Sequence, residues 1–248
     1  MNKFFIQRHD GFTLVEMAIV LVVLGFVLGA LLLPLRVQRE LVFQAQTEET
    51  LENAKQALLG FAQQYGRLPC PATRASNGAE LPLGGGACTQ QVGFLPAATL
   101  GVKPVDAQGF ALDGWNNRIV YAVTQINTVG GAATPDFTTS GEMANVGIAT
   151  LAPNIRVCAT STGANCTATI NLINNSALVI YSQGATGSQP IGGADETENL
   201  NAVANADTVF VNHDATVVSA PNGEFDHIVT WISPYVLYNA MIQAGQFH

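Results

Sequence analysis

The longest apolar stretch of the chain lies near its N-terminus. Residues 17–35 include 19 consecutive positions without a charged side chain. As a helix they extend about 28 Å, which is close to the hydrocarbon thickness of a bilayer. The pattern therefore predicts that residues 12–35 form a membrane-spanning helix.

The apolar pattern becomes periodic further along the chain. Apolar residues recur at steps of three and four, with charged residues between them, at Leu51, Ala54, Leu58, Phe61, Ala62 and Tyr65. This spacing predicts that residues 36–65 continue the helix with one face against a core. Gly66, followed by two nearby prolines, predicts its end.

Short β-type runs follow residue 66. Val, Ile, Tyr and Thr are concentrated between Gly and Asn clusters at 118–123, 176–182, 208–212 and 225–233. They predict an antiparallel sheet. Ser233 as N-cap, Pro234 as the first helical residue and Gly245 as a stop predict a short closing helix. The expected fold class is α+β, with the long helix packed on a β-rich domain over residues 66–248.

The charge balance restricts the partners. The chain has 18 acidic and 10 basic residues, a formal net charge of −8. Such an acidic surface is a poor general partner for nucleic acid or anionic lipid headgroups. We therefore expect no nucleic-acid ligand.

The four cysteines form two local groups in the sequence, Cys70 with Cys88 and Cys158 with Cys166. Neither spacing is that of a C-x-x-C or zinc motif. Two local disulfides are the favoured interpretation, although three pairings are possible and buried free thiols are an alternative. Disulfides would contribute about 2–4 kcal/mol each and indicate an oxidising compartment.

The order of charge, glycine and apolar run suggests an unusual leader. Lys3 and Arg8 precede the run, which predicts a cytoplasmic leader and a translocated body. An ordinary secretory signal places its small cleavage residue after the apolar core. Here Gly11 lies before the core, so cleavage after it leaves the helix on the mature protein.

The segment "GFTLVEMAIVLVVLG" resembles the signal of type IV pilins and type II secretion pseudopilins. The resemblance implies that prepilin peptidase removes residues 1–11 and that Phe12 becomes the methylated N-terminus. It also implies that Glu16 pairs with the N-terminal amine of a neighbouring subunit. Two alternatives for Glu16 are a position at headgroup depth and a pair with its own Phe12 amine. Pro34, at a depth where pilins often carry proline, marks either a simple kink or a segment that melts on assembly.

Parts of the body also resemble pseudopilins. "DGWNNRIVYAV", "VIYSQGATG" and "FDHIVTWIS" are similar to family strands, with Asn116 replacing a glycine and His227 an aspartate. The resemblance implies a type IV pilin-like fold. In several pseudopilins an acidic loop here binds calcium, so the candidate ligands are Asp195, Glu196, Glu198 and Asp226. The alternative is a solvated acidic loop.

The resulting functional prediction is a pilin-like or pseudopilin subunit, minor rather than major, in a pilus or secretion pseudopilus. Expected partners are other pilin subunits, prepilin peptidase and the inner-membrane assembly platform. The chain is expected to cross the bacterial inner membrane once, with its C-terminal domain outside. An adhesive or ligand-binding module on a pilin stem is the alternative.

We expect no catalytic residues. No hydrolase, zinc-protease or phosphate-loop motif occurs. The adjacent pairs His213–Asp214 and Asp226–His227 would point to opposite faces of a strand, which is poor geometry for a dyad.

Overall fold

The computed structural model describes residues 11–129, 134–160, 166, 170–187, 193–205 and 208–247, without the side chains of 30–36 and 201–205. The chain divides into two compact units, Met1–Val42 and Phe43–His248. A single helix, α1, covers Leu14–Tyr65 and contributes to both units. The predicted long helix is therefore confirmed as an element.

The first unit consists, in its described part, of the beginning of α1. Every side chain from residue 11 to residue 29 is exposed, including those of Phe12, Leu14 and Phe26. The helix continues through Pro34, whose side chain lies outside the described part. A search of the described residues identified no helix of sufficient length and apolarity to span a membrane.

The second unit contains two sheets and four shorter helices in its described part. The strands are β1 (Val92–Phe94), β2 (Val120–Val123), β3 (Ile155–Cys158), β4 (Asn171–Ser176), β5 (Leu178–Ser182), β6 (Val209–Val211) and β7 (Ile228–Ile232). The helices are α2 (Ala97–Leu100), α3 (Glu142–Val146), α4 (Ala194–Asn205) and α5 (Pro234–Gln243).

The larger sheet has the order β1-β2-β5-β7 and is antiparallel throughout, as predicted. The smaller sheet has the order β4-β3-β6, and its β3–β6 pair is parallel. The expectation of a single antiparallel sheet is therefore corrected. The hydrophobic pattern could not show this because it identifies strands but not their direction.

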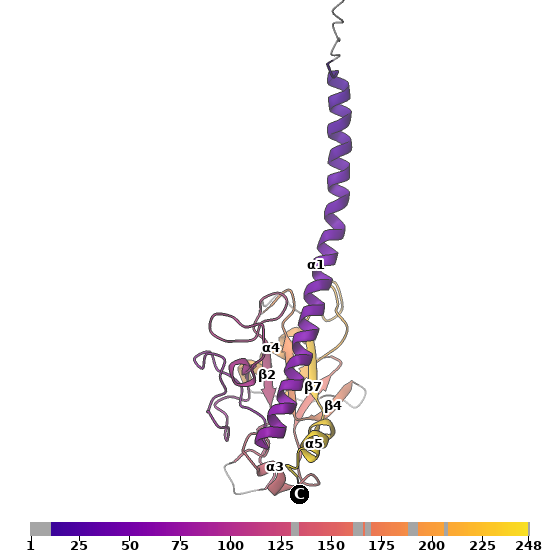
Figure 1. The fold of residues 1–248 in the computed structure, drawn as a ribbon. Coiled ribbons are helices and arrows are strands. Elements are labelled where there is room, and N and C mark those ends of the chain that lie inside the picture. The colour runs from indigo at the N-terminus through magenta and orange to yellow at the C-terminus, as the bar shows by residue number, and fades with distance from the viewer. Residues whose placement is uncertain are drawn as a thin grey trace, which may run out of the picture. The chain divides into compact units, whose positions relative to one another are not determined.

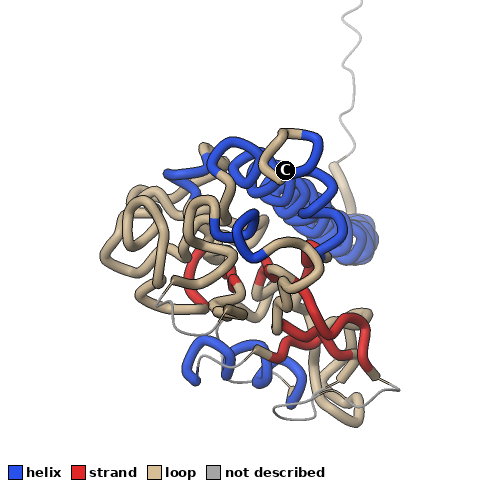
Figure 2. Tube along the Cα trace, turned by 90° about the horizontal axis from the view of Figure 1, so that it is seen from below, coloured by secondary structure: helices blue, strands red, loops and turns tan. Residues whose placement is uncertain are grey.

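The central strands of the larger sheet are buried on both faces. Successive residues alternate, so that Tyr121 and Ile180 belong to the core that includes Leu58 of α1. Val120 and Tyr181 belong to a second core shared with β3 and β6. The end of α1 crosses this sheet near β2 and β7 (Figure 1), and helices lie on both sides of the strands (Figure 2).

The closing helix α5 begins and ends as predicted. The Ser233 side chain accepts a hydrogen bond from the Val236 amide at 3.4 Å, and Pro234 is the first helical residue. Gly245 follows the C-cap with φ = 72°, the left-handed conformation that glycine adopts without strain. The Gln63 side chain donates to the Ala240 carbonyl at 3.1 Å, which ties α5 to α1.

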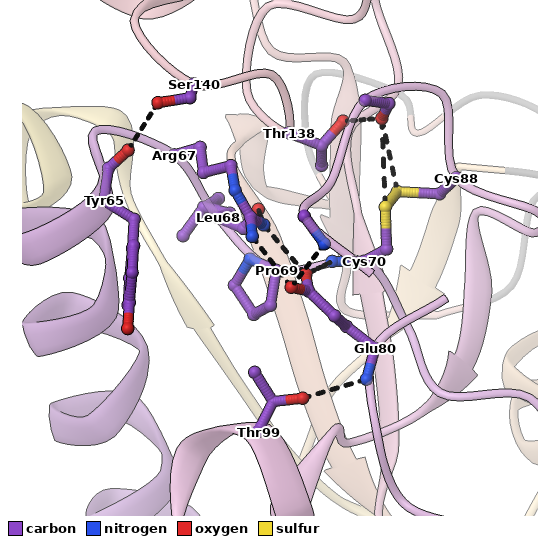
Figure 3. Close-up of polar contacts among 12 residues, drawn as sticks. Tyr65, Arg67, Leu68, Pro69, Cys70, Glu80, Cys88, Thr99, Thr138 and Ser140 are labelled. Atoms are coloured by element: carbon purple, nitrogen blue, oxygen red, sulfur yellow. Dashed lines mark hydrogen bonds and ion pairs between the residues drawn. A yellow bond between two sulfur atoms is a disulfide. The ribbon is translucent and has the colours of Figure 1, made fainter. Parts of the chain in front are cut away.

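Both predicted disulfides, Cys70–Cys88 and Cys158–Cys166, are present. The first closes a loop around a buried ion pair in which Arg67 donates to both carboxylate oxygens of Glu80 at 2.7 and 2.8 Å. Glu80 also accepts from the backbone amide of Cys70 at 3.2 Å (Figure 3). A loop dense in Pro and Gly thus has a polar centre that binds it to the end of α1.

Candidate functional site

The segment around Gly11 is open in the structure. Gly11, Phe12 and Thr13 precede α1 and are exposed. A Cβ added at Gly11 would meet no atom within 4 Å, and the residue does not have a positive φ. Because the fold itself does not require glycine here, a requirement for it would come from an enzyme that reads this segment.

Glu16 and Thr13 form a capping box at the start of α1. One carboxylate oxygen of Glu16 accepts from both the amide and the hydroxyl of Thr13, each at 2.8 Å. The Glu16 amide donates in return to the Thr13 hydroxyl at 3.3 Å. The arrangement satisfies free amides of the first turn and places a negative charge at the positive end of the helix.

The capping box fixes where the Glu16 carboxylate lies. It is held beside the amide of Thr13, the residue that follows Phe12. An amine released at Phe12 would therefore arise close to this carboxylate, and the second carboxylate oxygen accepts no hydrogen bond in the described part. This geometry is compatible with all three interpretations from the sequence: a pair with the amine of a neighbouring subunit, a pair with the Phe12 amine of the same chain, and a position at headgroup depth. The role of Thr13 was not predicted, although the pattern Thr-x-x-Glu is a sequence signal for such a cap.

Comparison with protein families adds a finding about the same segment. The model of the prokaryotic N-terminal methylation motif matches residues 6–32. The chain carries the type IV pilin and pseudopilin signal. Gly11, Phe12 and Glu16 all lie within it. Comparisons with curated proteins and with solved structures found no match.

The pilin signal supports a pilin-like or pseudopilin subunit. It implies processing by prepilin peptidase, assembly with other pilin subunits, and a membrane-anchored stage before the pilus. The matched residues end at residue 32, so they do not cover the second unit.

The predicted acidic loop is wrong as a structural element. Asp195, Glu196 and Glu198 lie on α4, and their side chains are buried rather than solvated. The helix begins at Ala194, so Asp195 and Glu196 occupy its first turn, where the helix dipole favours negative charge. The Gly-rich sequence before them suggested a loop and concealed this helix start.

The structure brings together only part of the predicted calcium set. Ligand atoms of Glu196, Asp226 and His227 lie within 4.8 Å of one another. Glu196 accepts from the Asp226 amide at 2.8 Å, and both Asp226 carboxylate oxygens accept hydrogen bonds from Thr186. Asp195 is engaged elsewhere, because its carboxylate accepts from Thr160 and Asn222 and lies 3.2 Å from His213 Nε2.

His227 has a defined tautomer. The Asn199 side chain is fixed by Val211, whose amide donates to Oδ1 at 2.7 Å and whose carbonyl accepts from Nδ2 at 3.1 Å. Asn199 Nδ2 must therefore donate to His227 Nδ1, at 3.1 Å, which leaves the proton of the neutral ring on Nε2. Burial lowers the pKa of His227 to about 4, so the ring is neutral at pH 7.

Glu196 has the opposite perturbation. Burial is the largest cause that raises its pKa to about 7, and the negative charges of Asp226 and Glu224 act in the same direction. The hydrogen bond from the Asp226 amide acts in the opposite direction and lowers the pKa. One of its oxygens, Oε2, is buried and accepts no hydrogen bond from the described residues. A cation would relieve this accumulation of negative charge.

These residues fit calcium only in part. Calcium takes six to eight oxygen ligands, whereas this cluster supplies two carboxylates and an imidazole that carries its proton on the free nitrogen. Calcium at Glu196 and Asp226 therefore stays a prediction.

Proposed function

We propose that the protein is a minor subunit of a pilus or secretion pseudopilus. It is inserted in the bacterial inner membrane through α1, with the second unit outside, and is assembled through the same helix. The methylation motif supports this assignment, as does the division of α1 into an exposed apolar part and a part buried in the core of the second unit.

The observation that carries the proposal is the exposure of the described apolar residues from Phe12 to Leu28. These side chains are between 49% and 86% exposed. Leaving apolar surface in water costs about 25 cal/mol per Å². A continuous apolar helix surface therefore requires cover from lipid before assembly and from other helices afterwards.

Glu16 gives the assembly its register. In the mechanism that we propose, prepilin peptidase cuts after Gly11 and frees the Phe12 amine. The amine of one subunit then approaches the Glu16 carboxylate of its neighbour, which Thr13 holds at the helix end. Each charge reduces the desolvation cost of the other once water is excluded, so the apolar helices are favoured at one axial position. Local unwinding near Pro34 in the filament stays a prediction.

Replacing Glu16 tests this proposal. Glu16→Val is expected to be processed normally but to reduce assembly at least tenfold, because the partner of the Phe12 amine is lost. The readouts are the mass of the mature chain and the amount of the subunit in sheared filaments. Glu40→Val is the control, since Glu40 is an exposed acid later in α1. Normal incorporation of Glu16→Val into filaments, or an equal defect in both variants, would contradict the register role.

A ligand-binding module carried on a pilin stem is the second candidate function. A cleft of about 840 Å³ in the second unit, lined by both apolar and polar residues, favours it. Binding pockets for small ligands have volumes of about 300–1,000 Å³.

A further inference from the structure

The cleft lies between the first disulfide loop, β1, β2 and the turn before β2. Among the described residues that line it, none is acidic, although the chain has a net charge of −8. Two arginines, Arg74 and Arg118, line it together with side-chain amides. The described lining thus has basic but no acidic side chains on an acidic protein.

The charge of Arg118 is already compensated. Its guanidinium donates to Asp106 Oδ2 at 2.6 and 2.8 Å and to Gln108 Oε1 at 2.5 Å. It also lies over the Phe110 ring, 4.1 Å from the centroid. Arg118 is therefore a fixed part of the wall.

Arg74 differs because its charge has no counterion in the described part of the chain. It is exposed, and its guanidinium carbon lies 5.8 Å from the centroid of the Phe94 ring. No described carboxylate lies within 4.0 Å of it. The backbone beside it is held, since Ala72 and Phe94 exchange two backbone hydrogen bonds at 2.8 and 2.9 Å. A fixed backbone thus presents a free guanidinium at the cleft.

Side-chain amides supply hydrogen bonds around this cation. Asn117 donates through Nδ2 to the Gly184 carbonyl at 2.7 Å, which leaves its oxygen as an acceptor. The side chains of Asn116 and Gln183 have no hydrogen bond in the described part. Asn116 has a left-handed backbone conformation, with φ = 67°, so the turn before β2 forms without a glycine at this position. Each amide places a donor and an acceptor side by side, as adjacent sugar hydroxyls require.

We propose that this cleft binds an acidic saccharide. The sugar carboxylate pairs with Arg74, and the ring hydroxyls exchange hydrogen bonds with Asn116, Asn117 and Gln183. An arginine forms two parallel hydrogen bonds with a carboxylate, so Arg74 selects for charge while the amides select for hydroxyls. The proposal goes beyond the filament role and does not depend on polymerisation.

The test uses the full-length chain in detergent and trigalacturonic acid as the probe, with calorimetric titration as the readout. We expect binding that weakens as salt is added, because screening reduces charge pairing. Arg74→Gln should weaken the affinity at least tenfold. Lys103→Gln removes the same charge from an exposed position outside the cleft and should change the affinity less than twofold.

A second variant changes the charge of the cleft without removing a hydrogen bond that holds the cleft together. Asn116→Asp keeps the size of the side chain, tolerates a positive φ and adds a negative charge to the cleft. It should weaken binding at least fivefold, with an unchanged melting temperature.

Four outcomes would overturn the proposal. These are no binding of trigalacturonic acid, unchanged binding by Arg74→Gln, equal binding of neutral maltotriose, and equal binding of triglycine through its free carboxylate. The third would exclude the role of the charge, and the fourth would exclude selection for a sugar. Each can be observed whether or not the chain forms filaments, so the result is independent of the Glu16 test.

Discussion

The two parts of α1 have the same secondary structure and opposite burial. In the first unit, every described side chain from residue 11 to residue 29 is exposed. In the second unit, Ala54, Leu58 and Ala62 are completely buried against the larger sheet. One helix therefore contains a surface covered by its own chain and a surface that requires another partner.

The carboxylates of the two units show the same contrast. Glu80 is buried and has its cation, Arg67, within the chain. Glu16 is exposed, and among the described residues its carboxylate has only the Thr13 cap. The comparison indicates that the second unit is stabilised internally, whereas under the proposed function the first is completed by processing, membrane and neighbouring subunits. Variants in the two units should therefore affect different measurements.

The largest expected effect is at the processing site. Gly11→Ala should leave nearly all of the chain uncleaved, because prepilin peptidase reads a residue that the fold does not constrain. Mass spectrometry of the membrane fraction would show the leader still attached. Gly25→Ala is a matched control, since an added Cβ at Gly25 also meets no atom within 4 Å, and this variant should be processed normally. A wild-type chain that retains its leader would contradict the prediction.

The buried ion pair should give the next largest effect, and it should appear only in folding. Glu80→Gln is expected to destabilise the second unit by about 3–5 kcal/mol, because it leaves Arg67 buried without a counterion. Glu52→Gln, which breaks the exposed pair with Lys55, should cost below about 1 kcal/mol. Urea unfolding of the full-length proteins measures both. Similar losses would show that the Arg67–Glu80 pair has no special role.

A pair of leucine variants compares the two surfaces of α1 directly. Leu58→Ala should cost about 2–5 kcal/mol, because it leaves a cavity in a closed core. Leu24 is 50% exposed, so Leu24→Ala should leave urea unfolding of the second unit unchanged. Equal destabilisation by both variants would show that residue 24 packs within its own chain.

The sequence predicted the elements whose patterns are strong and local. Short windows of the sequence show the apolar stripe of α1 and the caps of α5. They also show the apolar runs of β2, β5, β6 and β7. Strands β1, β3 and β4 were missed. β4 reads "NLINNS", in which three asparagines suggest a turn and the apolar Leu172 is exposed, so no alternation of buried apolar residues marks the strand. β1 is only three residues long.

The candidate site was less predictable because tertiary contacts define it. The Arg67–Glu80 pair joins residues 13 positions apart in an irregular loop, where no periodicity indicates a contact. His227 joins Glu196 because the register of β7 and the fixed Asn199 orient it there. By contrast, Gly11, Phe12 and Glu16 were identified from the sequence because they belong to a linear motif, which the family model matches over residues 6–32.

The smallest expected effect is a pH dependence that belongs to the second unit alone. The pKa of Glu196 is raised from 4.5 to about 7 in the folded chain, so its stabilising contribution is present below pH 4.5 and is lost as the pH rises through 7. The pKa of His227 is lowered from 6.5 to about 4, so its contribution grows with pH over that interval. The two trends offset each other up to pH 6.5, and that of Glu196 is the larger above it, because the unfolded His227 completes its titration by about pH 7.5.

Stability should therefore fall by about 0.5 kcal/mol between pH 6.5 and pH 8. Urea unfolding in the presence of a chelator measures this fall, and Glu196→Gln should abolish it because the amide does not titrate. Asp214→Asn, a change at an exposed acid, should leave it intact. Calcium at this cluster would favour the ionised carboxylate, so added calcium should raise stability most at pH 8 in the wild type and not in Glu196→Gln. A fall that persists in Glu196→Gln would assign the pH dependence to another group.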